Sequence, residues 1–179
     1  MIWDSSYWRR DLLETVQALK RVASRRRPSG KLCAEVEKRI FYGAFAVRKL
    51  MEAQVLSTKT RNAPIPVRVY RTSGMAPMFF NWHHIDRFYS LGDPQESCLA
   101  LLDVCNQLVH SYVFLPVTSS LTGPIKEIMF SSDRTRGKCL FQASLADLAQ
   151  AFQAAAMDYP SQMRCVLDKN RGDYVITSG

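Results

Sequence analysis

The strongest constraint on the fold is a long run of apolar residues at helical spacing near the start of the chain. Within residues 31–57 apolar side chains recur every three or four positions, which is typical of an amphipathic helix. They are Cys33, Val36, Ile40, Ala44, Val47, Met51 and Val55, and Phe41, Phe45 and Leu50 widen the stripe. A helix that is apolar over so much of its surface usually lies in the centre of a bundle. The sequence therefore predicts a central helix over 31–57 that other elements cover.

Two further helices are expected in the first 115 residues. A stripe from Trp8 to Val22 predicts a helix over 5–26, with Asp4 or the following serines as its cap. Asp93-Pro94 is a typical helix start and predicts a third helix that runs to about Ser111. Cys98 and Cys105 are seven residues apart, so we expect both on one buried face of that helix.

The segments between these helices are shorter and less regular. Residues 58–66 have the composition of a connector, and 66–71 alternate as a strand does. Because proline cannot donate to a sheet, Pro66 favours an edge strand. Residues 75–92 are rich in aromatic side chains, and their apolar residues follow neither the spacing of a helix nor the alternation of a strand. We therefore expect a helical bundle over 1–115 with an irregular aromatic segment inside it.

The pattern changes after residue 111. Short strands are expected at 112–118, 125–131 and 138–143, with a polar turn at 133–137. Ser144 begins a capping box that opens an Ala-rich helix to about Met157, and a hairpin follows over 163–177. Helices first and strands second indicate an α+β fold. We expect 116–179 to form a β-rich subdomain with one helix, packed on the first part.

The whole excess of positive over negative charge lies in the first third of the chain. Residues 1–61 contain 14 Lys and Arg against 6 Asp and Glu, whereas 62–179 contain 10 of each. A basic run surrounds the turn between the first two helices: Lys20, Arg21, Arg25, Arg26, Arg27 and Lys31. This run indicates RNA, DNA or an acidic protein as partner. A solvated helix end that compensates the helix dipole explains it equally well.

Composition excludes several classes of protein. At 47% hydrophobic residues the chain can bury a core, which excludes wholesale disorder. No apolar run approaches the ~20 residues that span a bilayer, and the charged first residues do not resemble a signal peptide. The five cysteines form no Cys-x-x-Cys motif, which suits a reducing cytoplasm. No phosphate-binding glycine loop or nucleophile motif is present, and we expect no cofactor and no metal.

Three polar residues on the expected third helix form the first candidate site. Asp103, Asn106 and His110 lie at positions i, i+3 and i+7, so all three project from one side of a helix. A carboxylate, an amide and an imidazole together can orient a histidine for proton transfer. The alternative is structural, with Asn106 and His110 hydrogen-bonded across the bundle to fix its packing.

The Asn106-x-x-x-His110 pair on a bundle helix resembles the HEPN superfamily (higher eukaryotes and prokaryotes nucleotide-binding). Its members are helical bundles, often paired, and many are ribonucleases of bacterial toxin–antitoxin and phage-defence systems. The family motif has an Arg before its polar residue, where this chain has Cys105. The resemblance implies a metal-independent ribonuclease in which Arg48 or Arg39, on the second helix, takes the place of the motif Arg.

The aromatic segment contains the second candidate site, in Trp82-His83-His84-Ile85-Asp86. Adjacent histidines point in different directions, so His83 and His84 rarely bind one metal ion together. His84 and Asp86 could do so on a strand, joined by His110 from elsewhere in the chain. The aromatic residues instead form a minor core, or stack on unpaired bases through Trp82 beside Arg87, or dock another chain.

Two main functions follow. The first is a non-catalytic component of a bacterial defence or toxin–antitoxin type of system, which binds nucleic acid or protein through its basic N-terminal region. The second is a divergent HEPN-like ribonuclease with His110 in its active site. A scaffold subunit that uses its aromatic segment is a third reading. In each case the chain would act as a homodimer or within a larger complex, without a membrane.

Overall fold

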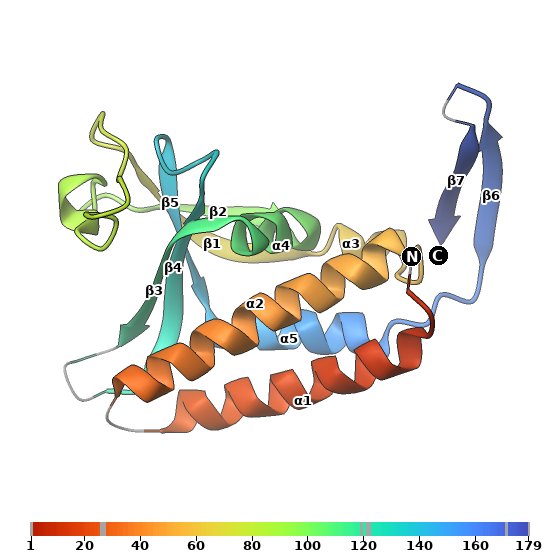
Figure 1. Ribbon diagram of the computed structural model, residues 1–179, viewed down its shortest axis with the longest axis horizontal. Coiled ribbons are helices and arrows are strands. Elements are labelled where there is room, and N and C mark those ends of the chain that lie inside the picture. The colour runs from red at the N-terminus through yellow and green to blue at the C-terminus, as the bar shows by residue number, and fades with distance from the viewer. Residues whose placement is uncertain (1, 26–27, 119, 121–122, 171, 179) are drawn as a thin grey trace.

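The computed structural model describes residues 2–25, 28–118, 120, 123–170 and 172–178. It has a mixed α+β fold, as the sequence predicts, with helices packed on an antiparallel sheet (Figure 1). The helices are α1 (Ser5–Ser24), α2 (Gly30–Glu52), α3 (Thr58–Arg61), α4 (Leu101–Val109) and α5 (Leu145–Met157). The strands are β1 (Pro64–Arg71), β2 (Gln95–Ala100), β3 (Ser111–Thr118), β4 (Ile125–Ser132), β5 (Cys139–Ser144), β6 (Met163–Asp168) and β7 (Asp173–Ser178).

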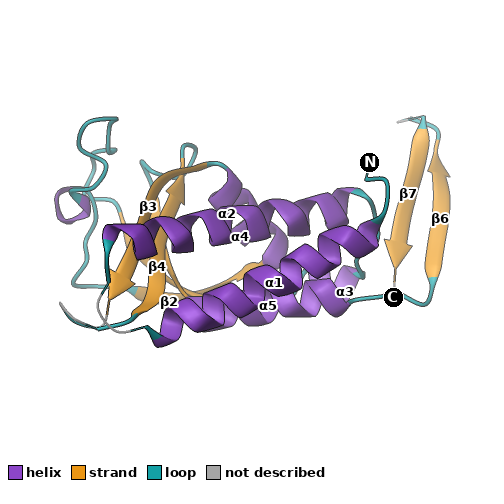
Figure 2. Ribbon diagram, turned by 60° about the horizontal axis from the view of Figure 1, so that its bottom comes forward, coloured by secondary structure: helices purple, strands orange, loops and turns teal. Residues whose placement is uncertain are grey.

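Helix α1 has the predicted cap and the predicted buried stripe. The Asp4 carboxylate accepts a hydrogen bond from the Ser6 N–H at 2.7 Å, which satisfies one of the unpaired donors at the helix start. Leu12, Val16 and Leu19 are almost fully buried against the neighbouring helices. Figure 2 shows α1, α2 and α5 side by side, and α1 packs on both of the others.

Helix α2 is central, as its apolar stripe predicts, and contacts α1, α4 and α5. Ser29 caps its start by accepting from the Leu32 N–H at 3.2 Å. Helix α2 approaches α5 so closely that a Cβ on Gly43 would overlap the ring of Phe152. The helix ends at Glu52 rather than at Ser57, because Gln54 adopts a left-handed φ of 60° that stops the helix.

The five-stranded sheet has the order β2-β1-β5-β4-β3, with antiparallel neighbours throughout. The prediction of an edge strand at 66–71 was wrong, because β1 lies between β2 and β5. Its prolines are tolerated because β5 pairs with β1 only from Arg68 onward. Pro64 and Pro66 therefore lie where β1 has a neighbour on one side alone.

The predicted start of the third helix was also wrong. Residues Gln95–Ala100 form the edge strand β2, and α4 begins only at Leu101. Cys98 is exposed on that strand, whereas Cys105 is buried on α4 as expected. Pairing with β1, a partner far along the chain, overrides the local helix signal of Asp93-Pro94.

The remaining elements follow the sequence pattern closely. Strands β3, β4 and β5 lie within one residue of the expected ranges, and Ser144 caps α5 by accepting from the Ala146 N–H at 3.1 Å. The sheet contains strands from both sides of residue 115, so the two halves of the chain share one core.

Strands β6 and β7 form a separate hairpin at the end of the molecule where both termini lie (Figure 1). In the described part of the chain, none of the helices has the length and apolar character to cross a membrane.

Candidate functional site

The end of α4 forms one wall of an open cleft of about 620 Å³. Asp103, Asn106, Gln107 and His110 line this wall, so the three residues expected to share a helix face lie together. The opposite wall is the turn between β4 and β5, with Ser132, Asp133, Arg134 and Thr135. His110 directly follows the helix and is exposed, while Asn106 is half-buried.

Backbone and side-chain hydrogen bonds fix both walls of the cleft. The His110 N–H donates to the Asn106 carbonyl at 3.3 Å, and the Asp133 N–H donates to the His110 carbonyl at 3.2 Å. The Gln107 amide oxygen accepts from the Ser132 N–H at 3.1 Å and from the Thr135 hydroxyl at 2.7 Å. These bonds hold the His110 backbone in place and leave its imidazole at the mouth of the cleft.

Arg48 reaches this imidazole from α2. Its Nη1 lies 3.3 Å from His110 Nε2, and its Nη2 donates to Glu52 at 3.2 Å. Because a guanidinium can only donate, Nε2 is the acceptor in a hydrogen bond between these two groups. Of the two arginines that the sequence left open, Arg48 is the one that contacts His110. Arg39 lines a different groove on α2.

Cys105, the residue before Asn106, points into the core. Its side chain is fully buried, and burial raises the pKa of the thiol to about 12, with Arg48 opposing the shift. The thiol is therefore protonated at neutral pH and is not a nucleophile. Arg48, on the facing helix α2, contacts His110 at the edge of the cleft.

A smaller cavity of about 210 Å³ adjoins the same wall. Arg48, Glu52, Arg61 and Asn106 are among its lining residues, so Asn106 borders both cavities. The pKa of the Glu52 carboxyl is lowered, chiefly by the hydrogen bond from Lys49 and further by Arg48, so Glu52 is a carboxylate that holds the Arg48 guanidinium. Arg48 and Arg61 line the small cavity with Glu52, and Arg134 lines the larger cleft with Asp103 and Asp133.

The aromatic segment divides into a buried part and an exposed part. Phe88 and Tyr89 are buried in a second, smaller core that Trp82 also contacts, which fits the minor-core interpretation. Phe79 and Phe80 are exposed and do not join it. Arg87 is exposed as well.

The histidines of this segment do not meet His110 at a metal site. The rings of His83 and His84 lie 4.1 Å apart. In the ranges that the structure describes, no three His, Cys, Asp or Glu side chains are grouped so that they can hold a metal ion.

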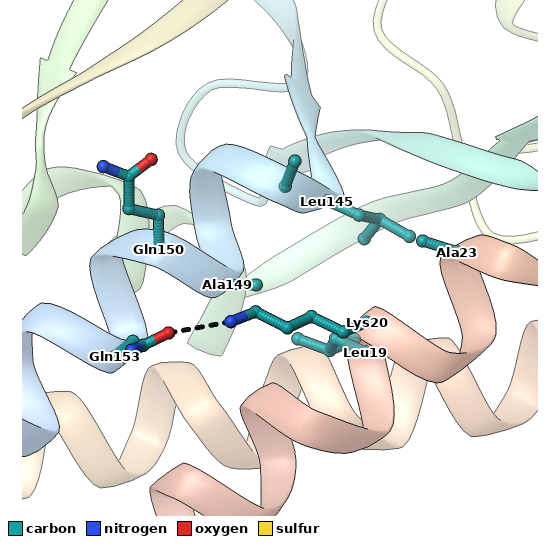
Figure 3. A pocket seen from close by; sticks show the side chains of 8 residues that line it. Leu19, Lys20, Ala23, Leu145, Ala149, Gln150 and Gln153 are labelled. Atoms are coloured by element: carbon teal, nitrogen blue, oxygen red, sulfur yellow. Dashed lines mark hydrogen bonds between the residues drawn. The ribbon is translucent and has the colours of Figure 1, made fainter.

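Much of the basic N-terminal run already has partners within the chain. Lys20 donates to Gln153 at 2.8 Å across an apolar pocket between α1 and α5 (Figure 3). Arg21 donates to the Gln17 carbonyl at 3.3 Å, and Arg25 lies 3.7 Å from Glu35. Arg26 and Arg27 fall outside the described residues. Lys31 lines a groove on α2 together with Lys38 and Arg39.

The second wall of the cleft was not predicted. The polar turn at 133–137 was recognised, but nothing local connects it with His110. The pairing of β3 with β4 makes the connection, because Ser132 lies opposite Ser111, the residue after His110. Predicting that hairpin register would have placed the turn beside the helix end.

No protein-family model, no curated protein and no solved structure matches this chain.

Proposed function

We propose that the chain binds single-stranded RNA in the cleft beside α4 and cleaves its backbone there, with His110 as the base and Arg48 as the phosphate ligand. The observation that carries this proposal is the 3.3 Å contact between Arg48 and His110 at the mouth of an open, polar cleft. A histidine that served only to fix the packing would be expected to lie buried, whereas His110 is exposed.

RNA suits this pair because it contains its own nucleophile, the ribose 2′-hydroxyl. In the proposed step the 2′-oxygen attacks the adjacent phosphorus while His110 Nε2 takes its proton. The bond from phosphorus to the 5′-oxygen breaks, and that oxygen takes a proton from the imidazolium. The products are a 2′,3′-cyclic phosphate and a 5′-hydroxyl, and the imidazole returns to its neutral form.

Arg48 would change partner in this sequence. A phosphate oxygen is a stronger acceptor for a guanidinium than a neutral imidazole, because charge-assisted hydrogen bonds are the stronger ones. An incoming phosphodiester would draw the Arg48 guanidinium from Nε2, which frees the nitrogen that has to accept the proton. Asn106 can then donate to a second phosphate oxygen, and Arg134 attracts the chain from the opposite wall.

The resemblance to HEPN ribonucleases belongs to this proposal. Asn106 and His110 would be the polar residue and the histidine of the motif, and Arg48 would supply from α2 the charge that Cys105 cannot. Within that resemblance the protein would be one component of a bacterial toxin–antitoxin or defence system in the cytoplasm. The sheet and the β6–β7 hairpin would be additions to the bundle.

The test is cleavage of a single-stranded RNA of mixed sequence by the wild type, His110→Ala and Arg48→Ala. We expect each variant to lose about 100-fold or more in rate, since proton transfer and charge stabilisation each contribute on that order. His83→Ala is the matched control, because it removes an exposed histidine away from the cleft. Equal rates in wild type and His110→Ala, or no cleavage by any of them, would overturn the proposal.

A second candidate is RNA or protein binding without catalysis, as one subunit of a larger assembly. It is favoured by a groove of about 520 Å³ on α2, lined by Lys31, Lys38 and Arg39 around Tyr42. Under this reading the protein binds RNA or an acidic protein without cleavage. Lys31→Glu with Lys38→Glu would then weaken binding and its salt dependence, while His110→Ala would leave both unchanged.

A further inference from the structure

The β6–β7 hairpin packs on itself and stands apart from the rest of the molecule (Figures 1 and 2). Met163 is 56% exposed, Val166 50% and Leu167 49%, so β6 is open to solvent along its length. A two-stranded hairpin is marginally stable alone, and an open strand edge is a template for another strand. The hairpin therefore has the properties of an element completed by a partner.

Exposed apolar residues gather at the same end of the molecule. Among the described residues, eight of the fourteen large hydrophobic side chains that are exposed belong to the start of α1, the end of α5 or the hairpin. They are Trp3, Tyr7, Met157, Tyr159, Met163, Val166, Leu167 and Tyr174. Figure 1 shows the start of α1, the end of α5 and the β6–β7 hairpin at the same end of the molecule, where both termini lie. Apolar surface concentrated in this way is typical of a protein interface.

The sequence of β6 is complementary to itself in an antiparallel pairing centred on Val166. In that register Arg164 lies opposite Asp168 of a second copy, and Asp168 lies opposite the second copy's Arg164. Cys165 then faces Leu167 of the copy, on the same side of the sheet. Opposite charges directly across a strand pair are stabilising, and this symmetric pairing contains two such pairs.

We propose that a second copy of this chain pairs its β6 with this β6, which gives a four-stranded sheet of the order β7-β6-β6-β7. A two-fold axis through Val166 relates the copies, as in most homodimers. Strand β7 is the less suitable edge, because Asp173 is its only charged residue and a symmetric pairing of β7 contains no opposite-charge pair. Arg164 makes no hydrogen bond or ion pair with any described residue, so its charge is available for the second copy.

Charge exchange tests this register. Sedimentation velocity of the wild-type chain over a wide range of concentration should show a monomer–dimer equilibrium. Arg164→Asp and Asp168→Arg each place two like-charge pairs in the interface, so each should weaken dimerisation by about tenfold or more. The double variant restores both opposite-charge pairs and should return dimerisation to near the wild-type level. Lys169→Asp, a charge change of the same kind in the turn next to β6, is the control and should dimerise normally.

A crosslink tests the register by a second route that does not depend on charge. Leu167→Cys should form an intermolecular disulfide with Cys165 on mild oxidation, and the same substitution combined with Cys165→Ser should not. A wild type that stays monomeric at every concentration would overturn the proposal. So would a dimer that both single charge variants leave intact, a double variant that fails to recover, or equal crosslinking with and without Cys165. Circular dichroism of each variant checks that the chain is folded.

Discussion

At the scale of single residues, burial decides which side chains can do chemistry in the cleft. His110 and Cys105 are five positions apart, yet one is exposed at the mouth and the other is fully enclosed. The enclosed thiol stays protonated, and the exposed imidazole is held by a guanidinium from another helix. Because the cation beside His110 comes from α2, the residue pattern of α4 alone does not reveal it.

This contrast predicts the outcome of placing an arginine at position 105. Cys105→Arg places a guanidinium in the core, where burying an unpaired charge costs more than about 4 kcal/mol, a large share of the stability of a typical domain. We expect the cooperative thermal transition to be lost or strongly lowered, with no gain in cleavage. Cys105→Ala removes only a small apolar group and should stay folded. A well-folded Cys105→Arg protein with increased activity would contradict this account of the site.

At the scale of elements, the sequence predicts best where the signal is local. The stripes of α1 and α2, the cap of α5 and the ranges of β3 to β5 all follow from residues close together in the chain. The prediction failed for the position of β1 in the sheet and for the nature of β2. Whether β1 is an edge strand depends on β5, and β2 is a strand only because β1 pairs with it. The cleft shows the same difference between local and distant information. Its α4 wall was predicted from the spacing of residues along one helix, whereas its second wall depends on the register between β3 and β4.

The closeness of α2 to α5 leads to a prediction about Gly43. Alanine usually stabilises a helix interior by about 1 kcal/mol over glycine, but at this position its Cβ would overlap the Phe152 ring. Gly43→Ala should therefore destabilise the protein by about 1–3 kcal/mol, which denaturant unfolding would measure. Gly30→Ala, at the start of the same helix, has open space around it and should not destabilise. Phe152→Leu combined with Gly43→Ala should recover part of the loss.

At the scale of the whole molecule, Arg9 joins three segments that are far apart in sequence. Its side chain is buried and donates to the carbonyls of Ala155 at 3.1 Å, Ala156 at 3.2 Å and Val55 at 2.7 Å. Its guanidinium also lies 4.2 Å from the centre of the Tyr159 ring. Burial lowers the pKa of Arg9, while Tyr159 and Asp158 oppose that shift. The residue thus holds the end of α5 and the segment after α2 against the start of α1.

Removing this cation should loosen all three segments together. Arg9→Met keeps the apolar stem but leaves three carbonyls without their donor, so we expect a loss of about 3 kcal/mol and a fall in Tm of about 10 °C. Arg10→Met is the matched control, because the Arg10 side chain is largely exposed and should contribute little. Equal melting temperatures for the two variants would show that the buried hydrogen bonds of Arg9 add no stability.

The strand order β2-β1-β5-β4-β3 also sets the time at which the sheet can form during synthesis on the ribosome. Strands β1 and β2 are made early and can pair at once, but the strand that completes β1 ends at Ser144. Until β5 and α5 leave the exit tunnel, β1 lacks its second neighbour and α1 lacks the helix on which it packs most extensively. Contacts that join such distant residues form slowly. The nascent chain therefore keeps part of its core uncovered until late in its translation, a period in which a chaperone would find its binding surface.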